Sequence, residues 1–182
     1  MTICPSDIDD ILSTMRVIAD TREQDTPQSR RRYKAIGVPV LRRKLDYGDY
    51  TACFTMPDGS EFTLEKIAVI ERKMNLDELE QCFTRGRKRF AAEFERAKEA
   101  GANVYLLIEN ASWDSAYLGS YKSKMSPQAM TASMLAWSAR YGCRIIMVSE
   151  RFSGRLLHDI LIREAREHFC RMIKDGLNSG EE

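Results

Sequence analysis

Charged side chains stand at the end of an apolar run in the stretch IAVIERKMNLD (67–77). In a β-strand successive side chains alternate between the two faces, so Glu71 and Lys73 would share one face while Arg72 lies on the other. Burying even part of a carboxylate–ammonium pair is costly unless partners compensate it. An ordinary ion pair at a strand end explains this stretch alone about as well as a catalytic site does.

Two further acidic motifs change that balance. The sequence DTRE (20–23) follows a short apolar segment, and Asp49 follows Gly48 at a break between two strand-like segments. A glycine before Asp49 lets the backbone bend and come close to a ligand. Carboxylates at several strand ends, with a lysine nearby, are what a magnesium-dependent phosphodiesterase needs.

The chemistry of such a set is well defined. Carboxylate oxygens hold a hard divalent cation, which also binds a phosphate oxygen and lowers the pKa of the attacking water. A lysine can orient that water or offset the negative charge that develops on the phosphate. These motifs therefore favour catalysis over a simple surface ion pair.

The elements that must position these residues alternate along the chain. Hydrophobic periodicity predicts strands at 16–20, 40–47, 50–56, 61–73, 104–109 and 143–148, and helices at 29–36, from 75, from 90, at 125–141 and at 153–174. Asn75 with Glu78 three residues later is a capping-box pattern that begins the second helix directly after a strand. The prediction is an α/β fold with a mixed central β-sheet flanked by helices.

The three motifs resemble a known signature. DTRE (20–23), GD (48–49) and ERK (71–73), with Asp77 following after three residues, are similar in order and spacing to the nuclease motifs of the XPF-type structure-specific endonucleases. That family belongs to the PD-(D/E)XK superfamily, whose core is restriction-endonuclease-like. The likeness begins at Val17 and continues through 85–109, and an ordered set of motifs is far more specific than a lone Glu-x-Lys.

The resemblance implies a metal site. Asp49 and Glu71 would be ligands of Mg²⁺ or Mn²⁺. Asp20 would be a further ligand, and Glu23 would support the site, directly or through water.

The resemblance also implies roles for the remaining motif residues. Lys73 would be the general catalytic cation, and Arg22 and Arg72 would organise the site or touch the scissile phosphate. Asp77 would support the ligands from behind. An acid in the first turn of a helix is favoured by the helix dipole in any case, which explains Asp77 nearly as well.

Length and composition limit the domain organisation. The chain has 182 residues, which is one ordinary domain's worth, and we expect a single nuclease domain with a core over about 15–175 and a frayed tail at 176–182. It has no Gly-x-x-x-x-Gly-Lys-Ser/Thr loop and 15 residues before the first motif, so no helicase is expected. The final helix lacks the paired glycine turns of a helix-hairpin-helix module, so a preference for branched DNA would come from a partner or a homodimer, or would be absent.

Net charge alone indicates no partner, because 28 Lys and Arg stand against 27 Asp and Glu. The bases are nevertheless clustered. The predicted DNA-binding residues are Arg30, Arg31, Arg32, Arg42 and Arg43 in the first cluster, and Arg85, Arg87, Lys88 and Arg89 in the second. Such clusters bind phosphate backbones with an affinity that falls as salt rises, although a charge run is more often a solvated face.

The segment 110–124 is loop-like and carries Trp113, Tyr117 and Tyr121 among lysines. These rings could stack on unpaired bases. Packing of a short helix onto the domain is the favoured explanation.

The prediction is therefore a metal-dependent DNA endonuclease that acts on branched, flap or fork DNA in recombination, repair or replication. The alternatives are a non-catalytic DNA-binding or scaffold subunit, and a junction-resolving or restriction-like nuclease. The resemblance implies a homodimer or heterodimer through the nuclease domain. No signal peptide or membrane-spanning segment is predicted, so we expect a cytoplasmic, nucleoid-associated protein, with a phage or mobile element as a candidate source.

Overall fold

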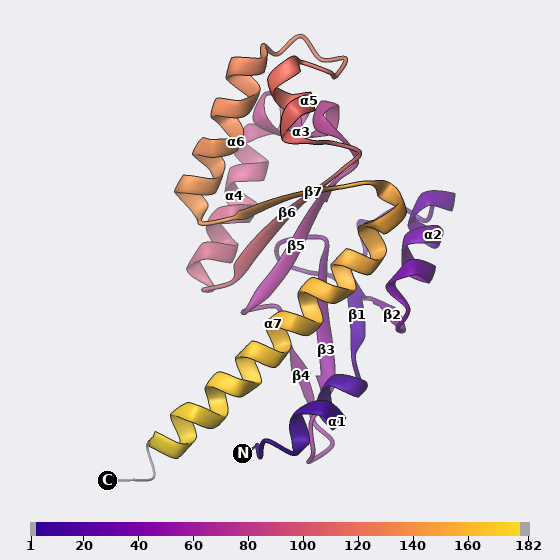
Figure 1. Cartoon of the computed structure of the whole chain (residues 1–182), viewed down its shortest axis with the longest axis vertical. Coiled ribbons are helices and arrows are strands. Elements are labelled where there is room, and N and C mark those ends of the chain that lie inside the picture. Colours follow the sequence, from indigo (N-terminus) through magenta and orange to yellow (C-terminus); the bar gives the residue numbers. More distant parts are fainter. Residues whose placement is uncertain (1–2, 179–182) are drawn as a thin grey trace.

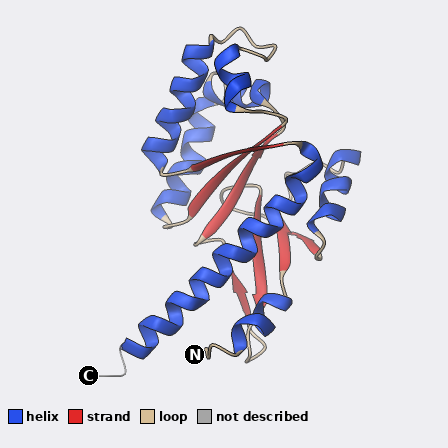
Figure 2. Ribbon diagram, viewed as in Figure 1, coloured by secondary structure: helices blue, strands red, loops and turns tan. Residues whose placement is uncertain are grey.

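The fold is an α/β arrangement around one mixed sheet (Figures 1 and 2). The computed structural model describes residues 3–178. Within them the strands are β1 (Arg16–Ala19), β2 (Val40–Arg42), β3 (Tyr50–Thr55), β4 (Glu61–Thr63), β5 (Ala68–Lys73), β6 (Asn103–Glu109) and β7 (Arg144–Val148). The helices are α1 (Asp7–Ser13), α2 (Pro27–Ile36), α3 (Leu76–Phe83), α4 (Arg87–Glu99), α5 (Trp113–Leu118), α6 (Pro127–Tyr141) and α7 (Glu150–Asn178).

The sheet has the strand order β2-β1-β3-β5-β6-β7, and β4 pairs with β3 outside this path. β3 is antiparallel to both β1 and β5, whereas β5, β6 and β7 run parallel to one another. Parallel neighbouring strands need crossover connections, which are usually helical. α3 and α4 connect β5 to β6, and α5 and α6 connect β6 to β7. The predicted fold class, a mixed sheet flanked by helices, is confirmed.

Each face of the sheet is covered by its own helices. α1, α2 and α7 pack on one face, where Leu157 and Leu161 of α7 belong to a core that includes Phe54 and Ile70. α3, α4, α5 and α6 pack on the other, around Trp137 of α6. The long α7 crosses the sheet diagonally (Figure 1).

Alternation along β5 decides which face each charged residue occupies. Val69 belongs to the core under α3–α6, and Ile70 belongs to the core under α7. Because side chains alternate along a strand, Glu71 and Lys73 lie on the same face as Val69, and Arg72 lies on the same face as Ile70. The predicted division of this motif between two faces follows from this register.

The motif-bearing ends of three strands meet at one edge of the sheet. Asp49 donates its backbone N–H to the carbonyl of Ile70 and accepts the N–H of Asp20, each over 2.8 Å. Gly48, with φ of 72°, passes so close to β5 that a Cβ there would lie 3.0 Å from the Cβ of Val69. Glycine is therefore required to bring Asp49 beside β5.

Several predicted bounds differ from the structure. The predicted strand 40–47 is only the three residues of β2, and the predicted strand 61–73 is interrupted at 64–67, where the backbone turns between β4 and β5. α1 was not predicted as a helix, and α7 begins three residues earlier than expected. Of the predicted frayed tail, 176–178 belong to α7 and 179–182 lie outside the described residues.

The predicted helix start at Asn75 is confirmed, because its side chain accepts the N–H of Glu78 over 2.9 Å. The aromatic segment forms α5, which packs against α6, and Trp113 and Tyr121 rest against the core while Tyr117 is exposed. Packing of a short helix, the favoured explanation, is what the structure has. Among the described helices, none is long and apolar enough to cross a membrane.

Candidate active site

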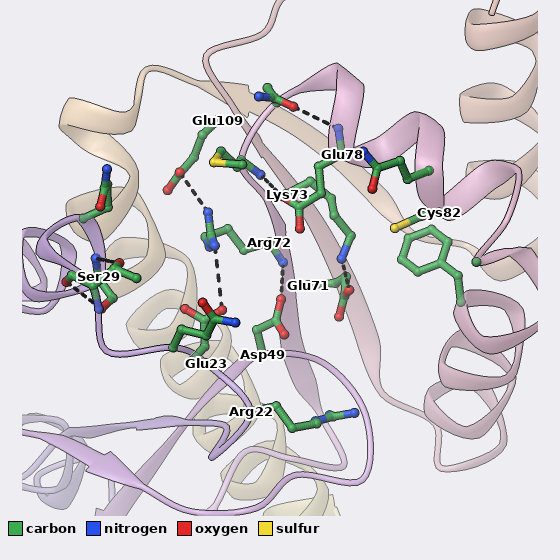
Figure 3. Close-up of a pocket in the computed structure, with 18 of the residues that line it drawn as sticks. Arg22, Glu23, Ser29, Asp49, Glu71, Arg72, Lys73, Glu78, Cys82 and Glu109 are labelled. Carbon is green, nitrogen blue, oxygen red and sulfur yellow. Dashed lines mark hydrogen bonds and ion pairs between the residues drawn. The ribbon is translucent and has the colours of Figure 1, made fainter. Parts of the chain in front are cut away.

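A cavity of about 1320 Å³ opens at the edge of the sheet where β1, β5 and β6 end and β3 begins. It contains most of the predicted motif residues, as Figure 3 shows. The predicted site residues that line it are Arg22, Glu23, Arg32, Asp49, Glu71, Arg72, Lys73, Arg85 and Arg89. Asp20 and Asp77 are not among its lining residues.

Two carboxylates and one ammonium lie together in this cavity. Lys73 Nζ lies 2.5 Å from Glu71 Oε1, and both side chains are almost fully buried. Asp49 Oδ2 accepts the backbone N–H of Arg72 over 2.8 Å. The second oxygen of each carboxylate is left to other partners.

Burial raises the pKa of Asp49 well above its usual value, and the neighbouring charge of Glu71 raises it further. Burial also raises the pKa of Glu71, although Lys73 opposes that shift. The pKa of Lys73 is raised because the charges of Glu71 and Asp49 outweigh its burial. Lys73 is therefore an ammonium at neutral pH, suited to stabilising negative charge and unsuited to accepting a proton.

The donor chemistry of this pair fits a divalent cation. Two buried like charges repel each other, and a cation between them removes that cost. The described residues include no group of three or more Asp, Glu, His and Cys side chains that could hold a metal. Mg²⁺ is commonly held by one or two carboxylates and keeps several waters, so Asp49 and Glu71 suffice.

Asp20 has a different environment from the one predicted for a metal ligand. Its carboxylate is fully buried, and both of its oxygens accept hydrogen bonds, from the N–H and Nε of Arg22 and from the N–H of Leu45. Burial raises its pKa, but these hydrogen bonds outweigh burial and lower it. Asp20 therefore orients Arg22, whose Nη1 also contacts Glu93 over 3.0 Å and whose side chain is half exposed in the cavity.

Glu23 lies in a buried ionic network. Its carboxylate accepts a hydrogen bond from the Tyr50 hydroxyl and pairs with Arg32 at 3.3 Å and with Arg72 at 3.7 Å. Both guanidinium groups also bind Glu109, each over 3.0 Å. Figure 3 shows Arg72 between Glu109 and Glu23.

Asp77 was predicted to support the metal ligands from behind, and the structure places it elsewhere. Its Oδ1 accepts the backbone N–H groups of Lys122 and Ser123, each over 2.8 Å. The carboxylate anchors the connection between α5 and α6 to the start of α3. Its position as the first acid of a helix explains it better than a place beside the ligands.

The members of the first basic cluster lie in different environments. Arg32, which was predicted to contact DNA, borders the cavity but is only 5% exposed and pairs with the buried acids Glu23 and Glu109. Arg30 and Arg31 are exposed but pair with Asp25 and Glu150. Arg42 donates to the carbonyls of Thr21 and Glu23, and Arg43 pairs with Glu61.

The second basic cluster does reach the cavity. Arg85 and Arg89 line it, and Arg87 and Lys88 are exposed on the same turn, where α4 begins. Arg87 lies over the ring of Trp137, with its guanidinium carbon 5.7 Å from the ring centroid. These bases form a positive rim on the α3–α4 side.

Sequence reasoning missed Glu109, Tyr50 and Phe90. Glu109 ends a buried strand, as Arg72 nearly does, and such a charge at the end of an apolar run was the available signal. Phe90 was predicted as core, yet its ring centroid lies 5.2 Å from Lys73 Nζ. Nothing in the periodicity of α4 shows that this ring touches a motif residue.

A family model for the ERCC4 domain matches residues 19–160, which is well over half of the chain. The chain belongs to the ERCC4 domain family. This match begins at the first motif and contains every residue of the cavity pair, so the resemblance to XPF-type nucleases is confirmed at the level of the family.

Solved structures show the same fold as this ERCC4 domain. XPF from Aeropyrum pernix matches with a TM-score of 0.60 and 20% identity over 83% of this chain and 65% of that one. The same protein in complex with DNA matches with a TM-score of 0.58 and 21% identity over 84% and 65%. The chain thus spans slightly less than two thirds of those chains, and no curated protein sequence matches it.

Proposed function

We propose that this ERCC4 domain is a metal-dependent DNA endonuclease that hydrolyses phosphodiester bonds. The observation that carries the proposal is the cavity pair Asp49–Glu71, with raised pKa values and beside a permanently charged Lys73. Buried acids of this kind, with a cation at contact distance and an open cavity, are typical of catalytic sites and expensive in a purely structural role.

Mg²⁺ or Mn²⁺ bound by Asp49 and Glu71 would polarise the phosphorus and lower the pKa of the attacking water. Lys73 would stabilise the charge that develops on the phosphate, because its ammonium stays protonated. Asp20 would act behind the site by orienting Arg22, whose half-exposed guanidinium would contact the scissile phosphate.

DNA would approach over the α3–α4 rim. Arg85 and Arg89 line the cavity there, and both side chains are exposed. The comparison structure of XPF from Aeropyrum pernix in complex with DNA supports DNA as the substrate class. A preference for branched, flap or fork DNA, a dimeric assembly, and a place in recombination, repair or replication are further parts of the proposal.

Cleavage of labelled flap, fork, junction and plain duplex DNA with Mg²⁺ tests the activity. Asp49→Asn and Lys73→Ala should lose it, whereas Glu164→Gln, a change on α7 outside the cavity, should keep it. Activity that survives in both site variants would remove the proposed site. Junction or duplex products in place of flap and fork products would select the resolving or restriction-like alternative.

The DNA-binding rim has its own test. Arg85→Ala and Arg89→Ala should weaken DNA binding and each reduce the slope of log affinity against log salt by about 1. Arg166 lies far along α7 and pairs with Asp9. Arg166→Ala should change neither the DNA affinity nor its salt dependence. If all three variants weaken DNA binding equally, the effect comes from net charge, which would contradict a DNA-binding rim at α3–α4.

The dimer has a separate test, which is the molar mass of the protein in solution with and without branched DNA.

A further inference from the structure

Four charged side chains and one hydroxyl form a closed network beside the cavity pair. Arg32 Nε donates to Glu109 Oε1 over 3.0 Å, and Arg72 Nη1 donates to Glu109 Oε2 over 3.0 Å. Arg32 Nη1 donates to Glu23 at 3.3 Å and to the Tyr50 hydroxyl at 3.0 Å. Glu109 thus uses both oxygens to bridge the two guanidinium groups.

The members come from elements far apart in the chain. Arg32 lies in the middle of α2, Arg72 near the end of β5 and Glu109 at the end of β6. Arg32 and Glu109 are buried, with exposures of 5% and 1%. The network therefore joins α2 to the site-bearing end of the sheet through charges that water does not screen.

Stability alone does not explain this network. A buried ionic cluster gives little net stability compared with apolar side chains of the same volume. The Arg72 Nε is buried and has no hydrogen-bond partner among the described residues, which carries a further cost. The arrangement fixes the direction of the Arg72 guanidinium but leaves its Nε donor without a hydrogen bond among the described residues.

Arg72 connects the network to the cavity pair Asp49–Glu71. Its backbone N–H binds Asp49 Oδ2, and its side chain lies in the cavity between Glu109 and Glu23. The two guanidinium groups balance the two carboxylates. Without Arg32, one negative charge would remain unbalanced beside the place where a phosphate must bind, and Glu109 would hold Arg72 from one side only.

We propose that Arg32 is a positioning residue, which acts through Glu109 and Glu23 to hold the Arg72 guanidinium toward the scissile phosphate. The inference rests on the proposed nuclease function. Arg32 borders the cavity but is only 5% exposed, and its Nε and Nη1 are engaged by Glu109, Glu23 and Tyr50. Its proposed role is therefore to set the direction and charge balance of Arg72.

The chain contains a matched control. At the opposite end of β6, Arg144 donates to the Tyr105 hydroxyl over 2.6 Å and to Glu164 over 2.8 Å, and that hydroxyl also binds Glu164. This second arginine–tyrosine–glutamate cluster lies outside the active-site cavity. Arg32→Met and Arg144→Met are therefore the same chemical change in two arginine–tyrosine–glutamate clusters, one buried beside the cavity and one half exposed away from it.

The kinetic test separates positioning from general damage. Arg32→Met should lower kcat for DNA cleavage by about 10–100-fold, with KM little changed, while Arg144→Met should leave both unchanged. In an Arg72→Ala background, Arg32→Met should cost no further activity, because its effect passes through Arg72. An unchanged kcat in folded Arg32→Met, or the same fold loss in both backgrounds, would overturn the proposal.

A second measurement needs neither metal nor cleavage. In protein labelled with ¹⁵N-arginine, the Arg72 Nη hydrogens, assigned from their absence in Arg72→Ala, should show slow rotation about the Cζ–N bond. Arg32→Met should speed this rotation and Arg144→Met should not. If the wild-type protein cleaves no DNA, the nuclease proposal fails while this measurement still tests whether Arg32 orders Arg72.

Glu109→Gln replaces Arg32→Met if Arg32→Met does not fold, because it keeps the shape but removes the bridging charge and one of the two acceptor oxygens. It should lower kcat and speed Arg72 rotation, and its matched control is Glu164→Gln. Slow Arg72 rotation that persists in every folded network variant would show that other contacts position Arg72, and the proposal would be wrong.

Discussion

The two faces of β5 hold charges in opposite ways. On one face Glu71 and Lys73 form a close pair at the cavity, beside Asp49, and both acids have raised pKa values. On the other face Arg72 lies in a network whose charges balance and whose carboxylates are fully engaged. The first face keeps carboxylate oxygens for a ligand, and the second uses them to hold other side chains.

In the proposed nuclease, this difference would separate the reacting groups from the groups that position them within three consecutive residues. Strand alternation places Glu71 and Lys73 against α3 and α4, and Arg72 toward α2 and α7. Replacing a charge on the first face should remove an electrostatic cost along with the activity. Replacing a charge on the second face should leave its buried partner without a compensating charge.

The largest expected effect is on activity. Glu71→Gln should reduce DNA cleavage by roughly a thousandfold or more, a loss of the size seen when a key electrostatic group is removed from an active site. Metal-free Glu71→Gln should nevertheless unfold at a temperature no lower than the wild-type protein. The measurements are single-turnover cleavage and thermal unfolding in EDTA, and a large loss of both would contradict the division between the faces.

The second effect is on stability. Glu109→Gln should lower the free energy of unfolding by about 3 kcal/mol, because it breaks a buried ionic network by removing one partner. Urea unfolding measures it, with Glu164→Gln as control, since Arg144 in that cluster is half exposed. If Glu109→Gln lowers the free energy of unfolding no more than Glu164→Gln does, the network around Arg72 contributes no more to stability than the half-exposed Arg144 cluster.

The sequence motifs named all three residues of the first face, but of the network they named only Glu23 and Arg72 as site residues. Glu71, Lys73 and Asp49 are recognisable because their types and spacing are local to two short motifs. The network depends on Arg32, Tyr50 and Glu109, which meet only after α2 and β6 have packed, so no spacing along the chain reveals them.

The same limit explains the errors in the predicted surface. A run of three arginines in α2 reads as one basic patch, yet the helix directs Arg32 inward while Arg30 and Arg31 stay exposed. The buried strands and most helices were predicted because their apolar periods reflect which faces are covered. The end of β2 at Arg42, the interruption at 64–67 and α1 were not predicted.

The third effect depends on pH. An unfolded aspartate titrates near pH 4, and burial with the charge of Glu71 raises the pKa of Asp49 in the folded protein. The folded state therefore holds this proton to higher pH than the unfolded state does, and the stability it contributes is lost as pH rises through the folded pKa. In EDTA, Asp49→Asn should gain stability over the wild-type protein as pH increases from about 4 to 8.

Thermal unfolding of both proteins across this range measures the difference, which should shrink when Mn²⁺ is added to the wild-type protein. An Asp20→Asn variant is the contrasting case, because the pKa of Asp20 is lowered by its hydrogen bonds to Arg22 and Leu45. Asp20→Asn should instead be less stable than the wild-type protein above pH 4. The same sign for both variants would show that the two carboxylates are not in opposite environments.

The smallest effect concerns the ring beneath Lys73. Phe90 stacks on Trp137 and lies 5.2 Å from Lys73 Nζ, whereas Phe94 shares the aromatic cluster and has no recorded contact with a motif residue. Phe90→Leu and Phe94→Leu should each lower the free energy of unfolding by about 1 kcal/mol through lost aromatic contacts. Phe90→Leu alone should also slow cleavage, by less than about tenfold, because a cation–π contact of this kind is worth roughly 0.5–2 kcal/mol. Equal cleavage rates in the two variants would show that the position of Lys73 is set by Glu71 and Asp49 without help from the ring.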